Sequence, residues 1–212
     1  MSERKLTEAE ARRKQAFEVL ETQMKEQGYG TEELRISAFR ANVFAVIISA
    51  PVWIGFLVLF LLLHGNPFSQ DYNGLLFILA MFVGIIVHEL IHGLTWSMYT
   101  QKGWKSIEFG IIWKYATPYC TCNEPMKKGP MIVAAIMPTI VLGILPAVLA
   151  IATGKWVLLL FAIVLIIGGG GDMMIILNIL KYRSKTGEVL FLDHPYEIGT
   201  IVFEKMTEES PF

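Results

Sequence analysis

Cysteine is nearly absent from this chain, and charged residues are sparse. Among 212 residues only Cys120 and Cys122 are cysteines, and one residue separates them, which is poor spacing for a mutual disulfide. We therefore expect two free thiols on a reducing face. Charged residues make up 17% of the chain, with a formal net charge of -1, and long stretches of its middle have none. This segregation is typical of membrane spans with solvated ends.

Apolar residues are abundant instead. They make up 54% of the chain, and the mean hydropathy is +0.51. These values indicate a membrane protein in contact with the lipid bilayer, so nucleic acid is not an expected partner. The start does not resemble a secretory leader, because the first long apolar run begins only near Ala41. We expect this run to direct insertion itself.

Four apolar segments are long enough to cross about 30 Å of hydrocarbon at about 1.5 Å per residue. They cover about residues 41–63, 74–98, 130–152 and 156–180. Lysine and arginine are frequent in the leading tail, in the 99–129 loop and after Leu180, whereas the 64–73 loop has none. The positive-inside rule therefore predicts a multi-pass protein, of the plasma membrane, with both termini in the cytoplasm. Pro138 and Pro146 predict a kink in the third span.

The segments outside the spans complete the predicted organisation. Residues 1–40 form a cytoplasmic helical region with roughly helical apolar spacing, either a membrane-surface helix or a solvated tail. Thr31 and the residues after it resemble the start of a second helix. Residues 41–182 form the four-span membrane domain. Residues 183–212 form a cytoplasmic tail, where alternation over 188–205 predicts one or two strands.

The loop between the second and third spans differs in composition. Residues 105–121 are rich in β-branched and aromatic side chains, which predicts a short interfacial hairpin. Its aromatic residues either anchor the protein at the headgroup level or contact an extended substrate. They are Trp104, Trp113, Tyr115 and Tyr119. The predicted fold class is an all-α membrane protein with about four transmembrane helices, a cytoplasmic amphipathic amino-terminal helix and a small interfacial β-hairpin.

One motif in the second span points to chemistry. His88-Glu89-Leu90-Ile91-His92 places two imidazoles at i and i+4 on one helix face, with the spacing that a single zinc ion needs. Glu89 lies beside them as a prospective general base. The alternative is a pair of packed polar residues that bridge helices. Ionisable groups are costly in hydrocarbon, however, and by default they mark a functional site.

A third metal ligand follows by elimination. Within the four spans the ionisable residues are His88, Glu89 and His92 in the second and Asp172 in the fourth. Both spans run from outside to inside, and a rise of about 1.5 Å per residue puts the imidazoles and Asp172 at a common depth, in the cytoplasmic third of the bilayer. The glycine run 168–171 indicates either close approach of the second and fourth helices or local unwinding that aims the carboxylate.

Two imidazoles and one carboxylate suit Zn²⁺ with an open position for water. Zinc lowers the pKa of such a water to about 7, and Glu89 can accept its proton and pass it to a leaving amine. Other divalent ions stay open. His194 is a candidate extra ligand or proton carrier, although a turn histidine is the simpler interpretation. His64 lies in the outer loop and has no expected role.

These features resemble the zincin membrane peptidases, which are similar to site-2 proteases, the intramembrane zinc metalloproteases. The resemblance covers about residues 40–204 and rests on the His-Glu-x-x-His motif, on Asp172 after a glycine run, and on the cysteine-containing loop with Asn123-Glu124-Pro125. It implies that His88, His92 and Asp172 bind zinc and that Glu89 is the base.

The chain departs from the site-2 protease pattern around its aspartate. It has Gly171-Asp172-Met173 where that pattern has Leu-Asp-Gly, and it lacks the upstream Asn-x-x-Pro. Asn178 and Asn123 are candidates for the oxyanion partner.

The sequence thus predicts a membrane-embedded zinc metalloprotease of the HExxH class. Its expected substrate is a membrane protein or peptide, cleaved near the cytoplasmic boundary. One alternative is a non-catalytic metal-binding membrane protein, such as a transporter component or an adaptor. Another is a zinc hydrolase that acts on a lipid or a small amide. Glu89 separates the first alternative from an enzyme, because a transporter has little need for a base beside its ligands.

Overall fold

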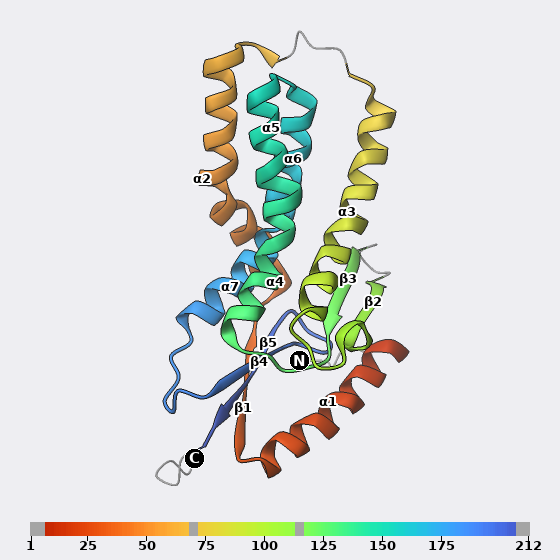
Figure 1. The fold of residues 1–212 in the computed structure, drawn as a ribbon, viewed down its shortest axis with the longest axis vertical. Coiled ribbons are helices and arrows are strands. Elements are labelled where there is room, and N and C mark those ends of the chain that lie inside the picture. Colours follow the sequence, from red (N-terminus) through yellow and green to blue (C-terminus); the bar gives the residue numbers. More distant parts are fainter. Residues whose placement is uncertain (1–6, 68–71, 113–116, 207–212) are drawn as a thin grey trace.

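The computed structural model describes residues 7–67, 72–112 and 117–206. Long helices gather at one end of the molecule, and a shorter helix and two small β-sheets gather at the other end (Figure 1).

A set of helical segments builds the apolar end. They are α2 (Ala38–His64), α3 (Gly74–Ser97), α4 (Lys128–Pro138), the π-helix η3 (Thr139–Ile144), α5 (Leu145–Thr153), α6 (Trp156–Gly168) and α7 (Gly170–Lys181). Within the described ranges, three stretches are long and apolar enough to cross a membrane: Val43–His64, Gly74–Ser97 and Lys128–Thr153. The pair α6 and α7 makes a fourth if it counts as one bent span.

The third apolar stretch is continuous but irregular. Pro138 closes α4, Pro146 lies in the first turn of α5, and the π-helix η3 connects them. Proline lacks the backbone N–H that an α-helix uses, so a wider turn between the two prolines relieves the mismatch. The disturbance predicted at these prolines takes the form of a π-helical segment.

The fourth predicted span is broken within its glycine run. The axes of α6 and α7 are bent by 42° at Gly169. A Cβ at Gly169 would lie 2.2 Å from Oγ1 of Thr139, and one at Gly170 would lie 2.5 Å from Cα of Ala45 in α2. The run therefore both breaks the helix and permits close packing. The expected partner was wrong, because these glycines approach the first and third spans rather than the second.

A three-stranded antiparallel sheet at the other end corrects the all-α prediction. It consists of β1 (Tyr29–Arg35), β4 (Val189–Asp193) and β5 (Gly199–Lys205), in the order β1-β5-β4. The prediction of one or two strands over residues 188–205 is confirmed, and the structure has two. The helix start predicted at Thr31 is wrong, because Thr31 pairs with Phe203 in the sheet.

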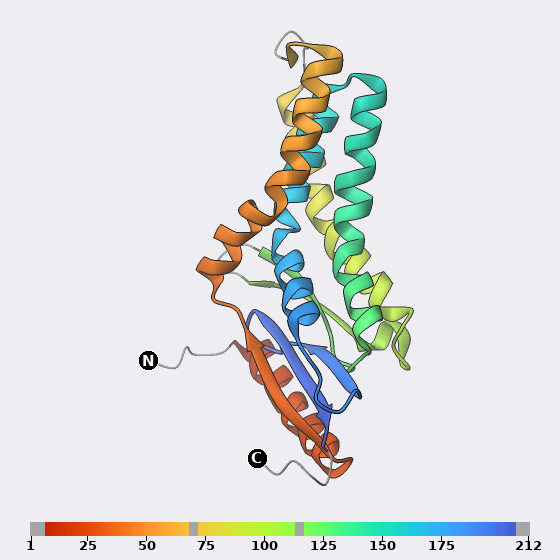
Figure 2. The ribbon, with the colours of Figure 1, turned by 90° about the vertical axis from the view of Figure 1, so that its left-hand side faces the viewer.

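The helix α1 (Glu8–Glu26) covers one face of this sheet (Figure 2). Thr7 and Glu10 form a capping box that starts the helix. Phe17 of α1 packs against Phe203 of β5. Val202, the residue before Phe203, belongs to the core on the opposite face of the sheet. The amino-terminal helix is therefore confirmed, but it is docked on the sheet rather than solvated on all sides.

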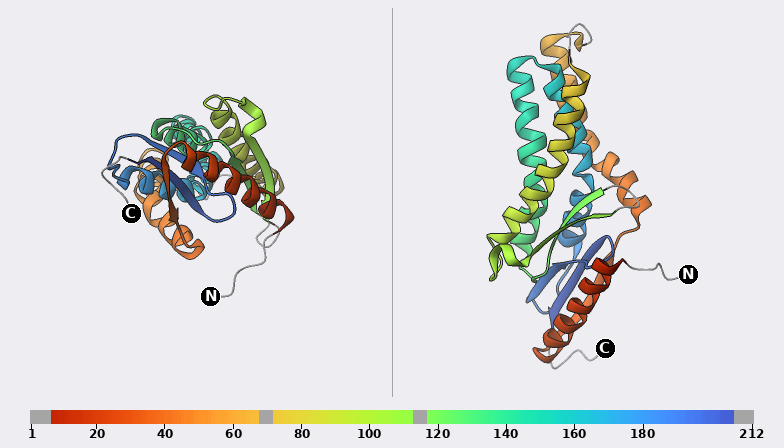
Figure 3. Two further views of the ribbon diagram at one scale, coloured as in Figure 1. Left: turned by 90° about the horizontal axis from the view of Figure 1, so that it is seen from below. Right: turned by 90° about the vertical axis from the view of Figure 1, so that its right-hand side faces the viewer.

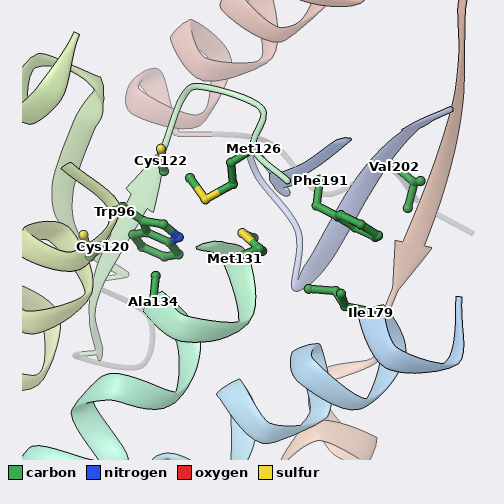
Figure 4. Packing of buried hydrophobic residues seen from close by; sticks show 9 residues of the cluster. All are labelled: Trp96, Cys120, Cys122, Met126, Met131, Ala134, Ile179, Phe191 and Val202. Carbon is green, nitrogen blue, oxygen red and sulfur yellow. The ribbon is translucent and has the colours of Figure 1, made fainter. Parts of the chain in front are cut away.

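The opposite face of the sheet joins the apolar helices through one shared core (Figure 4). Phe191 and Val202 from the sheet, Ile179 from α7, Met131 from α4 and Trp96 from α3 all belong to it. Burial of apolar side chains from all of these elements fixes the sheet beneath the helices.

The predicted hairpin is present between these two parts (Figure 3, right). A 3₁₀ turn, η2 (Gly103–Ser106), leads into β2 (Ile107–Ile112), which pairs with β3 (Thr117–Cys122). Its aromatic residues were expected either to anchor the protein at the headgroup level or to contact an extended substrate. Among them, Trp104 is half exposed and contacts the Phe109 ring. Trp113 and Tyr115 lie outside the described residues.

Candidate metal centre

The carboxyl-terminal half of α3 carries the motif, and the hairpin packs directly against it. A Cβ at Gly93 would lie 2.6 Å from the Phe109 ring, so glycine lets the hairpin approach the helix next to His92. One turn further along, the Trp96 ring stacks on His92 with centroids 5.3 Å apart and planes at 23°. These contacts hold His92, which is 4% exposed, in one orientation.

The side chains of His88, His92 and Asp172 converge. Nε2 of His88 lies 3.2 Å from Nε2 of His92 and 3.2 Å from Oδ2 of Asp172. The third side of the triangle, from Nε2 of His92 to Oδ2 of Asp172, is 3.4 Å. Zinc–ligand bonds of about 2.0–2.1 Å at tetrahedral angles put ligand atoms about 3.3 Å apart. The triangle therefore has the size that a zinc ion requires.

The hydrogen bonding of His92 also fits a cation. Its Nδ1 lies 2.9 Å from the backbone oxygen of Ala134 in α4, so Nδ1 donates, and in the neutral ring Nε2 carries a lone pair. In that form the lone pair faces a carboxylate oxygen of Asp172, and a cation between the two atoms would bind both. Zinc-binding histidines usually donate their outer nitrogen in this way. The donor set therefore fits Zn²⁺.

A cavity of about 230 Å³ opens beside the triangle. Glu89 lies in its wall next to the two histidines, and its carboxylate accepts a hydrogen bond from the backbone amide of Cys120 in β3. The hairpin thus holds the glutamate where it can exchange a proton with a group in the cavity.

Both cysteines are free thiols, as predicted. Burial raises the pKa of Cys120, and it raises the pKa of Cys122 to about 12. The thiols are therefore neutral at physiological pH and are poor candidates for metal ligands or nucleophiles.

His194 lies in a turn and is turned away from the triangle. Its Nδ1 accepts hydrogen bonds from the backbone amides of Tyr196 and Glu197, at 3.4 and 3.0 Å. Its Nε2 lies 3.6 Å from a carboxylate oxygen of Glu33. The extra-ligand interpretation is therefore wrong, because both ring nitrogens face other groups. His64 lies at the far end of α2, where Nε2 is 2.8 Å from the backbone oxygen of Ile151.

Sequence reasoning missed one residue of the cavity. Asp193, the last residue of β4, lines the wall together with Glu89 and Asp172. In the sequence, Asp193 stands out because its carboxylate directly follows four apolar residues. Only the fold brings that strand close to α3. The two asparagines considered for an oxyanion, Asn123 and Asn178, are not among the described residues that line the cavity.

Two histidines one turn apart, a carboxylate from a second helix and a glutamate in the same cavity form an arrangement that zinc hydrolases use. The model of the family described as "Putative zincin peptidase" matches residues 81–186, which is half of the chain, and the chain belongs to this family. Zinc is the cofactor that membership implies, and membership supports a metallopeptidase function. No curated protein and no solved structure matches the chain.

Proposed function

We propose that this chain is a membrane-embedded zinc metalloprotease that cleaves membrane or membrane-proximal substrates near the cytoplasmic boundary. In this proposal His88, His92 and Asp172 hold the zinc ion, and Glu89 is the general base. The observation that carries it is the triangle of ligand atoms, 3.2–3.4 Å on a side, beside a cavity that contains Glu89. Family membership supports the peptidase activity.

The chain's own groups supply the proton transfers of the reaction. When bound, zinc supplies Lewis acidity that polarises a carbonyl and makes water a nucleophile near neutral pH. Glu89 takes the proton from the attacking water and delivers it to the amine nitrogen as the C–N bond breaks. The backbone amide of Cys120 orients the Glu89 carboxylate for both transfers.

The strand β3 is suited to hold a substrate in extended form. β2 pairs with one of its edges, and no strand in the described part of the chain pairs with the other. The amide of Cys120 points toward Glu89 and hence away from β2, so the carbonyl of Cys120 points to the same free edge. A peptide added at this edge would pair with the carbonyl of Cys120 while the amide stays with Glu89, and it would lie along the cavity wall with a peptide bond near Glu89.

The exposed apolar surface supports a membrane location. On α3, Leu75, Ile78 and Phe82 are 78%, 66% and 63% exposed, and lipid would cover them. The loops between the spans suggest an orientation, because the 64–73 loop has no lysine or arginine. We propose that both termini lie on the cytoplasmic side of the plasma membrane, as do the sheets and the metal site.

The test compares the purified protein with Glu89→Gln, in detergent and in vesicles, on a transmembrane substrate. The control is Glu18→Gln, the same chemical change at an exposed position of α1. We expect wild type and Glu18→Gln to cleave, Glu89→Gln to lose at least about 100-fold in rate, and all three to bind one zinc ion.

Other results would favour other functions. Equal cleavage by Glu89→Gln would refute the protease assignment. Zinc binding without any cleavage would favour a metal-holding membrane protein. Hydrolysis of a lipid or a small amide, lost in Glu89→Gln, would favour the third class.

A further inference from the structure

Asp193 contributes a carboxylate to the cavity that the proposed reaction does not use. It comes from β4 of the three-stranded sheet and lies outside residues 81–186, the part of the chain that the family model matches. It does not belong to the group of three residues that converge on one point. Its presence in the cavity therefore needs a separate explanation.

The cavity carries more negative charge than a zinc ion neutralises. Three carboxylates line it, those of Glu89, Asp172 and Asp193, and none of the described lining residues is lysine or arginine. With all three ionised, two positive charges from zinc would leave one negative charge in the cavity. An uncompensated charge in such surroundings is costly unless a ligand neutralises it.

Arg13, a cationic side chain that acts on Asp193, is already engaged by other groups. Arg13 of α1 donates from Nε to the backbone oxygen of Pro195 at 2.7 Å and from a terminal nitrogen to the Tyr119 hydroxyl. The same guanidinium lies 3.8 Å from a carboxylate oxygen of Glu108. Arg13 therefore influences Asp193 only at a distance.

The hydrogen bond that Thr121 donates to the Asp193 carboxylate does not account for the charge of that carboxylate. Its carboxylate accepts from the Thr121 hydroxyl of β3, a contact that a neutral asparagine would also make. Burial raises the pKa of Asp193 to about 6, so a charge at this position has an energetic cost. A charge retained at this cost is typical of a group that pairs with a cation.

We propose that Asp193 is a specificity residue that pairs with a cationic group of the substrate beside the cleaved bond. The group is an ammonium or a guanidinium, from either a lysine or arginine side chain or a free amino terminus. This inference rests on the proposed peptidase function. It adds a substrate class, that of peptides with a positive charge next to the cleaved bond.

The experiment uses the zinc-loaded full chain and matched substrates. In one series, the substrates of a pair differ at a single position, which is lysine in one and glutamine in the other. The pairs cover in turn the two positions before and the two positions after the cleaved bond. In a second series, the amino terminus is free or acetylated. The variants are Asp193→Asn, which keeps the acceptor for Thr121, and Thr121→Val, which removes that hydrogen bond but keeps the carboxylate.

We expect wild type to prefer the charged member of a pair by about 10- to 100-fold in kcat/KM, the range for a charge-assisted hydrogen bond. Asp193→Asn should bring the ratio close to one while zinc content is unchanged, and Thr121→Val should keep the ratio. The series that shows the preference identifies the source of the charge.

Three results would overturn the inference. They are equal rates for charged and neutral substrates with wild type, an undiminished preference in Asp193→Asn, and loss of the preference in Thr121→Val alone. The first needs no variant, so it applies even if Asp193→Asn does not fold. Cleavage of no substrate by the zinc-loaded wild type would instead refute the proposed function, and this inference with it.

Discussion

The substitution Gly170→Ala should disturb the candidate metal centre, although Gly170 itself lies two residues before the proposed ligand Asp172. An alanine Cβ there would lie 2.5 Å from Cα and 2.6 Å from the backbone oxygen of Ala45 in α2. Ordinary carbon contacts are about 3.5–4.0 Å, so α7 and α2 must separate by about 1 Å. Ala45 contributes backbone atoms to this contact, and they cannot rotate out of the way.

That displacement is large for a metal site. Ligand distances must hold to about 0.2 Å, and Asp172 moves with α7. We expect Gly170→Ala to lower the free energy of unfolding by about 1–3 kcal/mol and zinc affinity by at least about tenfold. Thermal unfolding in detergent and zinc competition with a chelator measure the two effects.

Gly171→Ala is the matched control. A Cβ at Gly171 meets nothing within 4 Å, and the same is true at Gly168. Alanine there should be neutral, or stabilising by up to about 1 kcal/mol through reduced backbone entropy of the unfolded chain. Equal zinc affinity in Gly170→Ala and Gly171→Ala would refute the reasoning, because it would mean that contact with α2 does not position Asp172.

Three further predictions concern the ligands, the sheet and the orientation. Asp172→Ala should lose zinc and His194→Ala should keep it, because His194 faces Glu33. Metal analysis of the two proteins measures this, and the reverse pattern would contradict Asp172 as a zinc ligand. Burial disfavours the charged form of Glu204, but hydrogen bonds from Ser184, Tyr182 and the loop amides outweigh this effect and lower the pKa of Glu204 to about 2. The ionised carboxylate therefore stabilises the fold above about pH 4.5, and this stabilisation is lost as the pH falls toward 2. Glu204→Gln should therefore lower the melting temperature at pH 7, by the equivalent of about 1 kcal/mol, with a difference from wild type that shrinks below pH 4.5; a difference independent of pH would contradict this. In a cysteine-free background, an impermeant thiol reagent should label Lys155→Cys from outside intact cells and Lys185→Cys only after lysis, and the opposite result would invert the orientation.

Local patterns in the sequence were enough for the spans and for the motif. Hydropathy over twenty residues does not depend on the rest of the fold, so the first three apolar stretches match their predicted positions. The i, i+4 spacing of His88 and His92 needs only a helix. Asp172 was found because ionisable residues are rare in apolar segments, and the structure does bring it to the two histidines.

Two features that depend on distant partners were not found this way. Thr31-Glu32-Glu33-Leu34 has the composition of a helix start, but pairing with the buried strand β5 makes it a strand. The glycine run predicted close packing without naming the partner, because nothing local specifies α2.

The amino-acid sequence by itself was enough to locate the apolar stretches and the candidate ligands within them, since both follow from residue type and helical periodicity. Only the tertiary structure decided which other groups surround the metal centre. It turned His194 toward Glu33, aimed the Cys120 amide at Glu89, and brought Asp193 into the cavity, although Asp193 lies more than a hundred residues after both histidines. Contacts between segments so far apart depend on the packing of the whole chain, and no local pattern encodes them.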